Sequence, residues 1–421
     1  MARLSLPDEG SPPRAFGRSL GVWLCVLSLA ACAGVLLACA GCRGPVLTRQ
    51  ERLRATWAGY KKAFIVDGRV VRPRNGSDTV SEGQAYAMLR AAWMGDKQTF
   101  DQCYAWTETH LSRRERFGDN LLAWRYGKAP GGGPRVLDWN AASDADLDYA
   151  LALLLAAGLW KENPPTGLTA YREKALAVAA DVMRKEVREL PGGRLVLVPW
   201  PVTDAEGTDG RTLVNPSYFS PAHYRAFYEE TGDARWKKLL DDTYDELARI
   251  LQRLGDVQGV GLAPDWCLVD DEGRAIPSTK HGTVSSWDAF RLWWRLALDW
   301  SWAREQRAKA LLEGRLLPFL RREMAERGRV CVEYDYAGKA VKAYSSPAVL
   351  GTYAWALREI DASVCEELQR KLQGYFRSRK GRGFYGDASD YYVSSWAWFG
   401  DAVGEDFVSP PGLHLKGEED L

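Results

Sequence analysis

The sequence has little histidine, almost no excess charge and no complete nucleotide-binding or serine-hydrolase motif. Its 4 histidines show no H-x-x-x-H or Cys/His spacing, which argues against a zinc site. A formal net charge of +1 over 421 residues indicates no basic surface for nucleic acid. There is no G-x-S-x-G elbow, and Gly259-Val260-Gly261 lacks the third glycine of a dinucleotide site. We therefore expect no metal, no cofactor and no nucleic-acid partner.

Cysteine is scarce outside the N-terminal segment. Four of the 8 cysteines fall within the first 42 residues, and the others are widely spaced: Cys103, Cys267, Cys331 and Cys365. An oxidising compartment would permit disulfides among these four, but no spacing demands one. We expect buried free thiols, and the sequence leaves disulfide pairing open.

The N-terminal segment has the plan of an export signal. Arg14 and Arg18 precede an apolar run from Leu20 to Ala40, which ends in small residues and Cys42. Cys39-Ala40-Gly41-Cys42 resembles the end of a bacterial lipoprotein signal, in which Cys42 would be lipidated. A plain signal peptide and an uncleaved anchor stay open, because the run is long enough to span a bilayer. All three predict an exported protein, periplasmic, outer-membrane-anchored or secreted, with membrane contact only through this segment.

Helical periodicity dominates the rest of the chain. The predicted helices cover residues 48–65, 81–94, 98–112, 144–160, 168–188, 219–232, 235–253, 285–302, 304–325, 346–357, 361–377 and 390–401. Short strands are expected at 194–199 and 329–334. Antiparallel helix pairs fit six hairpins in an (α/α)6 barrel or an open α-solenoid, and the lack of a fixed-period repeat favours the barrel. We expect one all-α domain over residues 46–405, after the signal or anchor at 1–45 and before a solvated tail at 406–421. We see no sign of an oligomer interface and expect a monomer.

Long irregular segments interrupt the helices at 66–80, 113–143, 189–218, 254–284 and 326–345. Loops of this length in a compact domain are typically functional. They are rich in Trp, Asp, Arg and Gly, which suits a substrate groove at one end of a barrel. The 18 Trp and 18 Tyr exceed what a core needs, and such rings suit the apolar faces of sugars, although we expect most Trp in the core.

Two carboxylate segments open predicted helices. Ser81 is a favourable N-cap, so Glu82 falls in the first turn, where it either caps the helix or faces a cleft. In the second segment, Asp144 and Asp148 share a helix face and Asp146 points elsewhere. One explanation for these three aspartates is that acidic residues near a helix N-terminus stabilise the helix dipole. A calcium-binding loop does not explain them, because its required glycine and its twelfth ligand are absent.

A third segment places Asp288 and Arg291 three residues apart near the start of a helix crowded with aromatic residues. An ion pair would explain this spacing. However, two carboxylates, one protonated and one ionised, are also what glycosidic bond cleavage requires.

Together the three segments resemble family 8 of the glycoside hydrolases, most closely the periplasmic endoglucanases that accompany bacterial cellulose synthases. Ala142-Ser143-Asp144-Ala145-Asp146 through Trp160 follows the family signature, with Tyr149 in place of Ile or Met. Ser81-Glu82-Gly83-Gln84 matches the segment of the family's general acid. Trp287-Asp288-Ala289-Phe290-Arg291 is similar to the segment of the base, with Trp287 in place of Tyr. The likeness covers roughly residues 50–402, and the family fold is an (α/α)6 barrel.

The resemblance implies an inverting endo-β-1,4-glucanase, or cellulase, acting on cellulose-type β-glucan. Glu82 would be the general acid and Asp288 the base, with carboxyl groups ~6.5–9.5 Å apart. Asp144 would hydrogen-bond the sugar at the cleavage point, and Arg291 would contact sugar or keep the base ionised. The aromatic residues that we expect at the substrate are Trp124, Trp200, Tyr218, Tyr392 and Tyr86. A cellulose-synthesis apparatus is a candidate partner.

Two alternatives stay open. The same mechanism could act on xylan, chitosan or mixed-linkage β-glucan. The chain could also be a non-catalytic glycan-binding lipoprotein that keeps the barrel. The intact Glu82, Asp144 and Asp288 argue against this last alternative, since binding alone needs no acid–base pair.

Overall fold

The computed structural model describes residues 47–161, 163–201, 211–252, 261–402 and 408–411. The chain divides into two units, Met1–Thr48 and Arg49–Leu421, and the fold below is that of the second unit. The predicted signal or anchor, including Cys42, lies outside the described residues. No helix in the described ranges is both long and apolar enough to cross a membrane.

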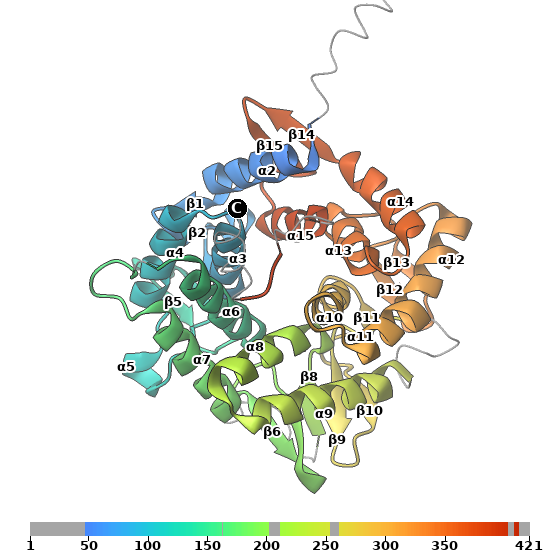
Figure 1. Cartoon of the computed structure of the whole chain (residues 1–421), viewed down its shortest axis with the longest axis horizontal. Coiled ribbons are helices and arrows are strands. Elements are labelled where there is room, and N and C mark those ends of the chain that lie inside the picture. Colours follow the sequence, from blue (N-terminus) through green and yellow to red (C-terminus); the bar gives the residue numbers. More distant parts are fainter. Residues whose placement is uncertain (1–46, 162, 202–210, 253–260, 403–407, 412–421) are drawn as a thin grey trace, which may run out of the picture. The chain divides into compact units, whose positions relative to one another are not determined.

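Six helices of the described chain form a closed inner ring, in which each packs against the next and the last against the first (Figure 1). They are α3 (Ser81–Trp93), α6 (Ser143–Leu159), α8 (Pro221–Thr231), α10 (Phe290–Ala303), α13 (Pro347–Leu357) and α15 (Tyr391–Asp401). Every residue of α13 is buried, as expected for a helix covered on all sides. The apolar composition of these helices thus sets their place in the inner layer.

A second layer of helices packs on the outside of the ring (Figure 1). These are α2 (Arg49–Phe64), α4 (Lys97–His110), α7 (Tyr171–Lys185), α9 (Ala234–Ile250), α11 (Gln306–Leu311), α12 (Leu317–Arg327) and α14 (Ala362–Gln373). A π-helical turn, η6 (Leu312–Leu316), joins α11 to α12. In α9 the buried residues Trp236, Leu239, Thr243, Leu247 and Ile250 recur at helical spacing, so one stripe faces the ring. The paired layers confirm the predicted (α/α)6 barrel.

Small antiparallel sheets lie between the helices, most of them in the segments predicted to be irregular. The strands are β1 (Ile65–Val66), β2 (Arg69–Val70), β3 (Thr79–Val80), β4 (Arg125–Lys128), β5 (Pro134–Asp138), β6 (Val187–Leu190), β7 (Arg194–Leu197), β8 (Arg211–Val214), β9 (Cys267–Asp270), β10 (Ala275–Pro277), β11 (Val284–Ser285), β12 (Glu333–Asp335), β13 (Ala340–Lys342), β14 (Phe376–Arg379) and β15 (Arg382–Tyr385). They pair in the orders β1-β2, β3-β4-β5, β6-β7, β8-β9-β10, β11-β12-β13 and β14-β15. The strand predicted at 194–199 is present as β7. The one at 329–334 is largely wrong, because β12 starts only at Glu333.

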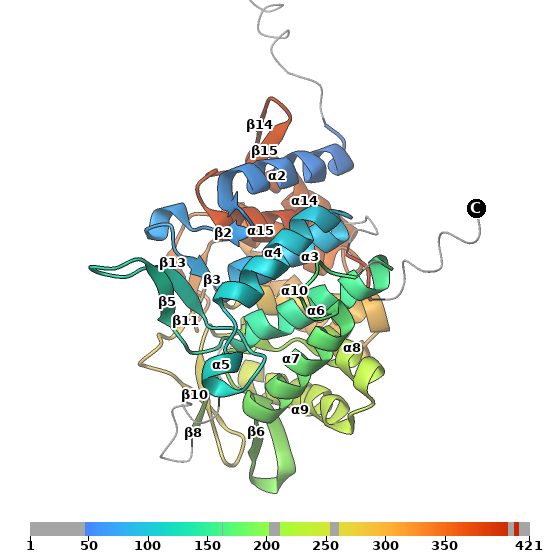
Figure 2. The ribbon, with the colours of Figure 1, turned by 90° about the vertical axis from the view of Figure 1, so that its left-hand side faces the viewer.

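The inner helices begin at the end of the barrel where three of these sheets gather, β3-β4-β5, β8-β9-β10 and β11-β12-β13 (Figure 2). Strand β3 leads directly into α3, and a short helix η4 (Pro216–Tyr218) precedes α8. The first turns of several inner helices therefore face one region.

Three local expectations are corrected. Helix α10 begins at Phe290 rather than 285, because Val284 and Ser285 pair with β12 and Asp288 lies in the turn that follows. Ser81 does not cap α3: its hydroxyl is buried and makes no hydrogen bond within the described residues. The tail predicted to be solvated is packed at Val408, whose carbonyl accepts a 3.0 Å hydrogen bond from the Trp302 indole. The four cysteines of the described chain are buried and free, as expected.

Candidate active site

A cleft of about 370 Å³ opens at the end of the barrel where the inner helices begin. Its lining includes Glu82, Trp124, Asp138, Asn140, Asp144, Trp200, Tyr218, Trp266, Asp288, Arg291 and Tyr392. The three predicted carboxylates and four of the five predicted aromatic residues thus share one cavity. Contact of these side chains with a substrate stays a prediction.

A second hollow of about 350 Å³ adjoins the cleft and shares Asp288 and Tyr392 with it. Its other lining residues include Arg72, Arg74, Asn75 and Ser389. Because the two hollows have Asp288 in common, the depression continues on both sides of this carboxylate. Such an extended shape suits a chain-like ligand better than a single small molecule.

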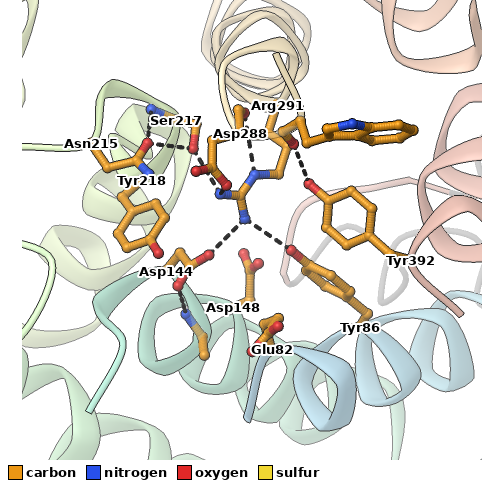
Figure 3. Close-up of polar contacts among 12 residues, drawn as sticks. Glu82, Tyr86, Asp144, Asp148, Asn215, Ser217, Tyr218, Asp288, Arg291 and Tyr392 are labelled. Carbon is orange, nitrogen blue, oxygen red and sulfur yellow. Dashed lines mark hydrogen bonds and ion pairs between the residues drawn. The ribbon is translucent and has the colours of Figure 1, made fainter. Parts of the chain in front are cut away.

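Arg291 is the centre of the polar contacts in the cleft (Figure 3). Its guanidinium donates to Asp144 Oδ2 and Asp288 Oδ1, both at 2.7 Å. It also donates to Ser217 Oγ at 2.9 Å and Tyr86 Oη at 3.2 Å. The side chain is only 3% exposed, so its charge is balanced by these two carboxylates rather than by water.

Glu82 lies in the first turn of α3, where the sequence predicts it. Tyr391 Oη donates a 3.0 Å hydrogen bond to Oε1, whereas Oε2 is buried and has no partner in the described residues. Burial, and then the charge of Asp144, raise the pKa of Glu82 to about 7, while the backbone N–H of Glu82, Arg72 and Tyr391 act in the opposite direction. Near neutral pH this carboxyl group is therefore able to hold a proton.

Asp288 lies in the turn before α10 with its side chain 31% exposed. Arg291 donates to one of its oxygens, and Trp266 Nε1 donates to Oδ2 at 3.0 Å. Two donors stabilise the charged form of a carboxylate. One cleft carboxyl group is thus buried with a raised pKa, and the other is ion-paired and partly exposed, the kind of difference that acid–base pairs exploit.

Asp144 is buried at the start of α6, and one turn further along lies Asp148. Burial raises the pKa of Asp144, against the positive charges of Arg291 and Arg295. Asp148 accepts hydrogen bonds from both terminal nitrogens of Arg295, at 2.8 and 2.9 Å, and pairs with His223 Nε2 at 2.8 Å. Asp148, Arg295 and His223 therefore form a second ion-paired layer, one helical turn behind the layer that Arg291 forms with Asp144 and Asp288.

Asp146 points away from the cleft, as its spacing predicts. It is fully buried and accepts the backbone N–H of Leu122 at 2.8 Å. Within the described ranges, no group of three or more His, Cys, Asp or Glu side chains is arranged to hold a metal ion.

Tyr86, which the sequence predicts at the substrate, does not line the cleft. It lies four residues after Glu82 on the same face of α3, but that face turns into the barrel, so Tyr86 is 0% exposed. Its hydroxyl accepts a hydrogen bond from Arg291 (Figure 3). Tyr86 therefore supports Arg291 from behind rather than lining the cleft.

The predicted set lacks Tyr391, Ser217 and Trp266, which hydrogen-bond to predicted site residues, and also Asp138 and Asn140 of the cleft lining. Tyr391 precedes the predicted Tyr392 and holds Glu82, whereas the hydroxyl of Tyr392 donates to the Trp287 carbonyl at 2.6 Å. Ser217 lies in η4 and Trp266 on a loop, and only the folded structure reveals their contacts.

Comparison with known proteins identifies the family. The family described as "Glycosyl hydrolases family 8" matches residues 30–355. Endoglucanase A of Acetivibrio thermocellus is 29% identical over 344 residues, which are 80% of this chain and 66% of that protein. An endoglucanase of Pseudomonas fluorescens is 37% identical over 241 residues, 56% of this chain and 57% of that protein. The chain thus spans about half to two thirds of the length of the curated relatives it matches.

A solved structure shares the fold. The endo-1,4-D-glucanase from Vibrio fischeri superposes with a TM-score of 0.68 at 26% identity, covering 82% of this chain and 93% of that one. The family match extends over well more than half of the sequence and includes Glu82, Asp144 and Asp288. The chain therefore belongs to family 8 of the glycosyl hydrolases.

Proposed function

We propose that the protein is an endo-acting, inverting glycoside hydrolase that cleaves β-1,4-glucan. The observation that carries the proposal is the contrast between two carboxyl groups of one cleft. Glu82 is buried with a raised pKa, and Asp288 is hydrogen-bonded by Arg291 and Trp266. The endoglucanase names of the matched relatives support a glucan as the substrate.

In this mechanism Glu82 protonates the oxygen of the leaving sugar as the glycosidic bond breaks. Its Oε2, which has no partner in the described part of the chain, is the oxygen suited to carry that proton, because Oε1 is engaged by Tyr391. Asp288 removes a proton from a water molecule, which attacks the anomeric carbon from the opposite face. The product anomer is inverted, and the two carboxyl groups then exchange protons with solvent.

Asp144 and Arg291 are proposed to bind the sugar at the cleavage point. Both line the cleft, and their ion pair holds two side chains from different inner helices, α6 and α10, in fixed positions. Trp124, Trp200, Tyr218 and Tyr392 are proposed to stack on neighbouring sugars. The adjoining hollow beyond Asp288 provides room for the chain to continue, which supports endo-acting cleavage.

Xylan, chitosan and mixed-linkage β-glucan remain alternative substrates. Reducing-sugar release from a panel of these polysaccharides and soluble cellulose, by the wild type and Glu82→Gln, tests the proposal. We expect release from the β-1,4-glucan, and a strong loss in the variant. Equal release by both proteins would exclude Glu82 as the acid, and no release from any glycan that binds would favour a glycan-binding protein. NMR of the first product anomer tests inversion separately.

We further propose that the protein is exported as a monomer and trims glucan made by the same cell. The basic and apolar pattern of residues 14–42 supports export. Metabolic labelling with a fatty acid, compared between the wild type and Cys42→Ser, distinguishes a lipoprotein from the other two signal types. Label retained in Cys42→Ser would exclude Cys42 as the lipidated residue.

A further inference from the structure

Two consecutive residues, Asp265 and Trp266, hold the turn that carries Asp288. Oδ1 of Asp265 accepts the backbone N–H groups of Ser286 at 2.7 Å and Ala289 at 2.8 Å. Its other oxygen accepts the Ser286 hydroxyl. These bonds bracket Asp288 on both sides, so Asp265 fixes the backbone from which this side chain extends.

Trp266 contacts the side chain of Asp288 itself. Its Nε1–H donates to Oδ2 at 3.0 Å, while Arg291 Nη2 donates to Oδ1 at 2.7 Å. Each carboxylate oxygen thus has one donor, and the two donors come from different elements. A carboxylate held in this way has a fixed plane, which a base needs in order to face one water molecule.

The same indole ring borders the cleft. Its centroid lies 6.1 Å from that of Trp200 and 6.0 Å from that of Tyr218. The His281 ring stacks on the indole at a centroid distance of 5.1 Å. The backbone carbonyl of Trp266 accepts a 3.2 Å hydrogen bond from the Tyr336 hydroxyl. The ring is therefore held between its neighbours and cannot turn away from Asp288 without displacing them.

We propose that Asp265 and Trp266 form a clamp that positions the base: Asp265 sets its backbone, and Trp266 sets the orientation of its carboxylate and stabilises the charged form. This inference rests on the proposed function of Asp288. According to this proposal, Trp266 orients the base through a hydrogen bond, in addition to any contact that its ring makes with sugar. Both members are positioning residues.

Several other charged or titratable groups lie near Asp288 and interact with it electrostatically. They are Arg291 of α10, Asp265 of the loop before β9, Tyr218 of η4 and Tyr392 of α15. A substitution at Trp266 changes no formal charge among these groups. A shift in the pH profile can therefore be assigned to the lost hydrogen bond.

The test is the pH dependence of kcat/KM for Trp266→Phe, which keeps an aromatic ring but has no N–H. We expect kcat to fall about tenfold, and the acidic limb of the profile to move to higher pH, because the ionised base has lost a donor. The alkaline limb, which belongs to Glu82, should stay in place. Trp200→Phe is the matched control: it changes a cleft indole outside this hydrogen bond and should leave the acidic limb unmoved.

Asp265 gives a second comparison. Asp265→Asn keeps an oxygen for the two backbone N–H groups and should retain most of the kcat, whereas Asp265→Ala loses the acceptor and should not. Circular dichroism and the Tm of each variant identify those that fail to fold.

An unmoved acidic limb in folded Trp266→Phe would overturn the clamp. Failure of the proposed function has a different signature: Asp288→Asn would then retain wild-type activity, whatever happens at Trp266.

Discussion

Tyr391 donates a 3.0 Å hydrogen bond to one carboxylate oxygen of Glu82, and the other oxygen is buried without a partner among the described residues. The bond favours the ionised form, so it opposes the increase in pKa that burial causes. Tyr391 thus anchors the carboxyl group and limits how far its pKa rises.

Removing this hydrogen bond should shift the activity of the enzyme to higher pH. In Tyr391→Phe the carboxylate loses a donor, so the pKa of Glu82 rises further above about 7. The acid must be protonated to act, and the alkaline limb of kcat/KM should therefore move upward. Tyr392→Phe is the control, because its hydroxyl donates to the Trp287 carbonyl. An alkaline limb that stays in place in Tyr391→Phe would contradict this role.

The loss caused by Glu82→Gln should depend on the leaving group. On unactivated glucan we expect kcat to fall by roughly 10²–10⁴-fold, the usual contribution of general acid catalysis. On an aryl cello-oligosaccharide whose phenol leaves without protonation, the fall should be much smaller. Initial rates on both substrates provide the measurement. Falls of equal size would indicate that Glu82 acts in binding rather than in proton donation.

Arg291→Met should destabilise the fold as well as abolish activity. The substitution leaves Asp144 and Asp288 without their shared cation, and loss of one partner from a buried ion pair costs about 3–5 kcal/mol. Urea denaturation should show the loss in the free energy of unfolding. In the Asp144→Asn background, the same substitution should cost less, because one of the unpaired charges is absent. Costs that simply add would show that the pair is not coupled.

The buried His223 should make the protein less stable as the pH falls. Burial lowers the pKa of His223 below its usual value, although its hydrogen bond to Asp148 opposes this. The unfolded chain then binds a proton at a higher pH than the folded one, so stability is lost as the pH falls below about 6.5. The free energy of unfolding should therefore differ less between pH 7.5 and pH 5.5 in His223→Gln than in the wild type. His110→Gln, on an outer helix, is the matched control, and identical pH slopes in all three proteins would refute the prediction.

The short motifs predict the carboxylates of the site but only part of their surroundings. Glu82, Asp144 and Asp288 each belong to a segment at or near the start of an inner helix, so local pattern was enough to select them. Tyr86 is also expected at the substrate, but the sequence alone does not show that its side chain is buried inside the barrel. That depends on how α3 packs against the rest of the ring.

Two of the residues that the sequence did not identify lie outside the long helices. Ser217 is in the short helix η4 and Trp266 is on a loop, and their roles arise from contacts with Arg291 and Asp288 far away in the sequence. The choice between Tyr391 and Tyr392 depends on the exact first residue of α15. Local sequence rarely defines a helix boundary to within one residue.

The two ion-paired layers behind the cleft have a mechanical consequence. Asp144 and Asp148 are one turn apart on α6, and so are their partners Arg291 and Arg295 on α10. The two ion pairs therefore join the same two helices, α6 and α10, at two successive turns. A slide of α6 along its axis by one 5.4 Å turn would match only one acid with one arginine and strand the other two charges in the core. The deeper ion pair, Asp148–Arg295, thus keeps α6 and α10 in register at the cleft although it does not line the cleft itself.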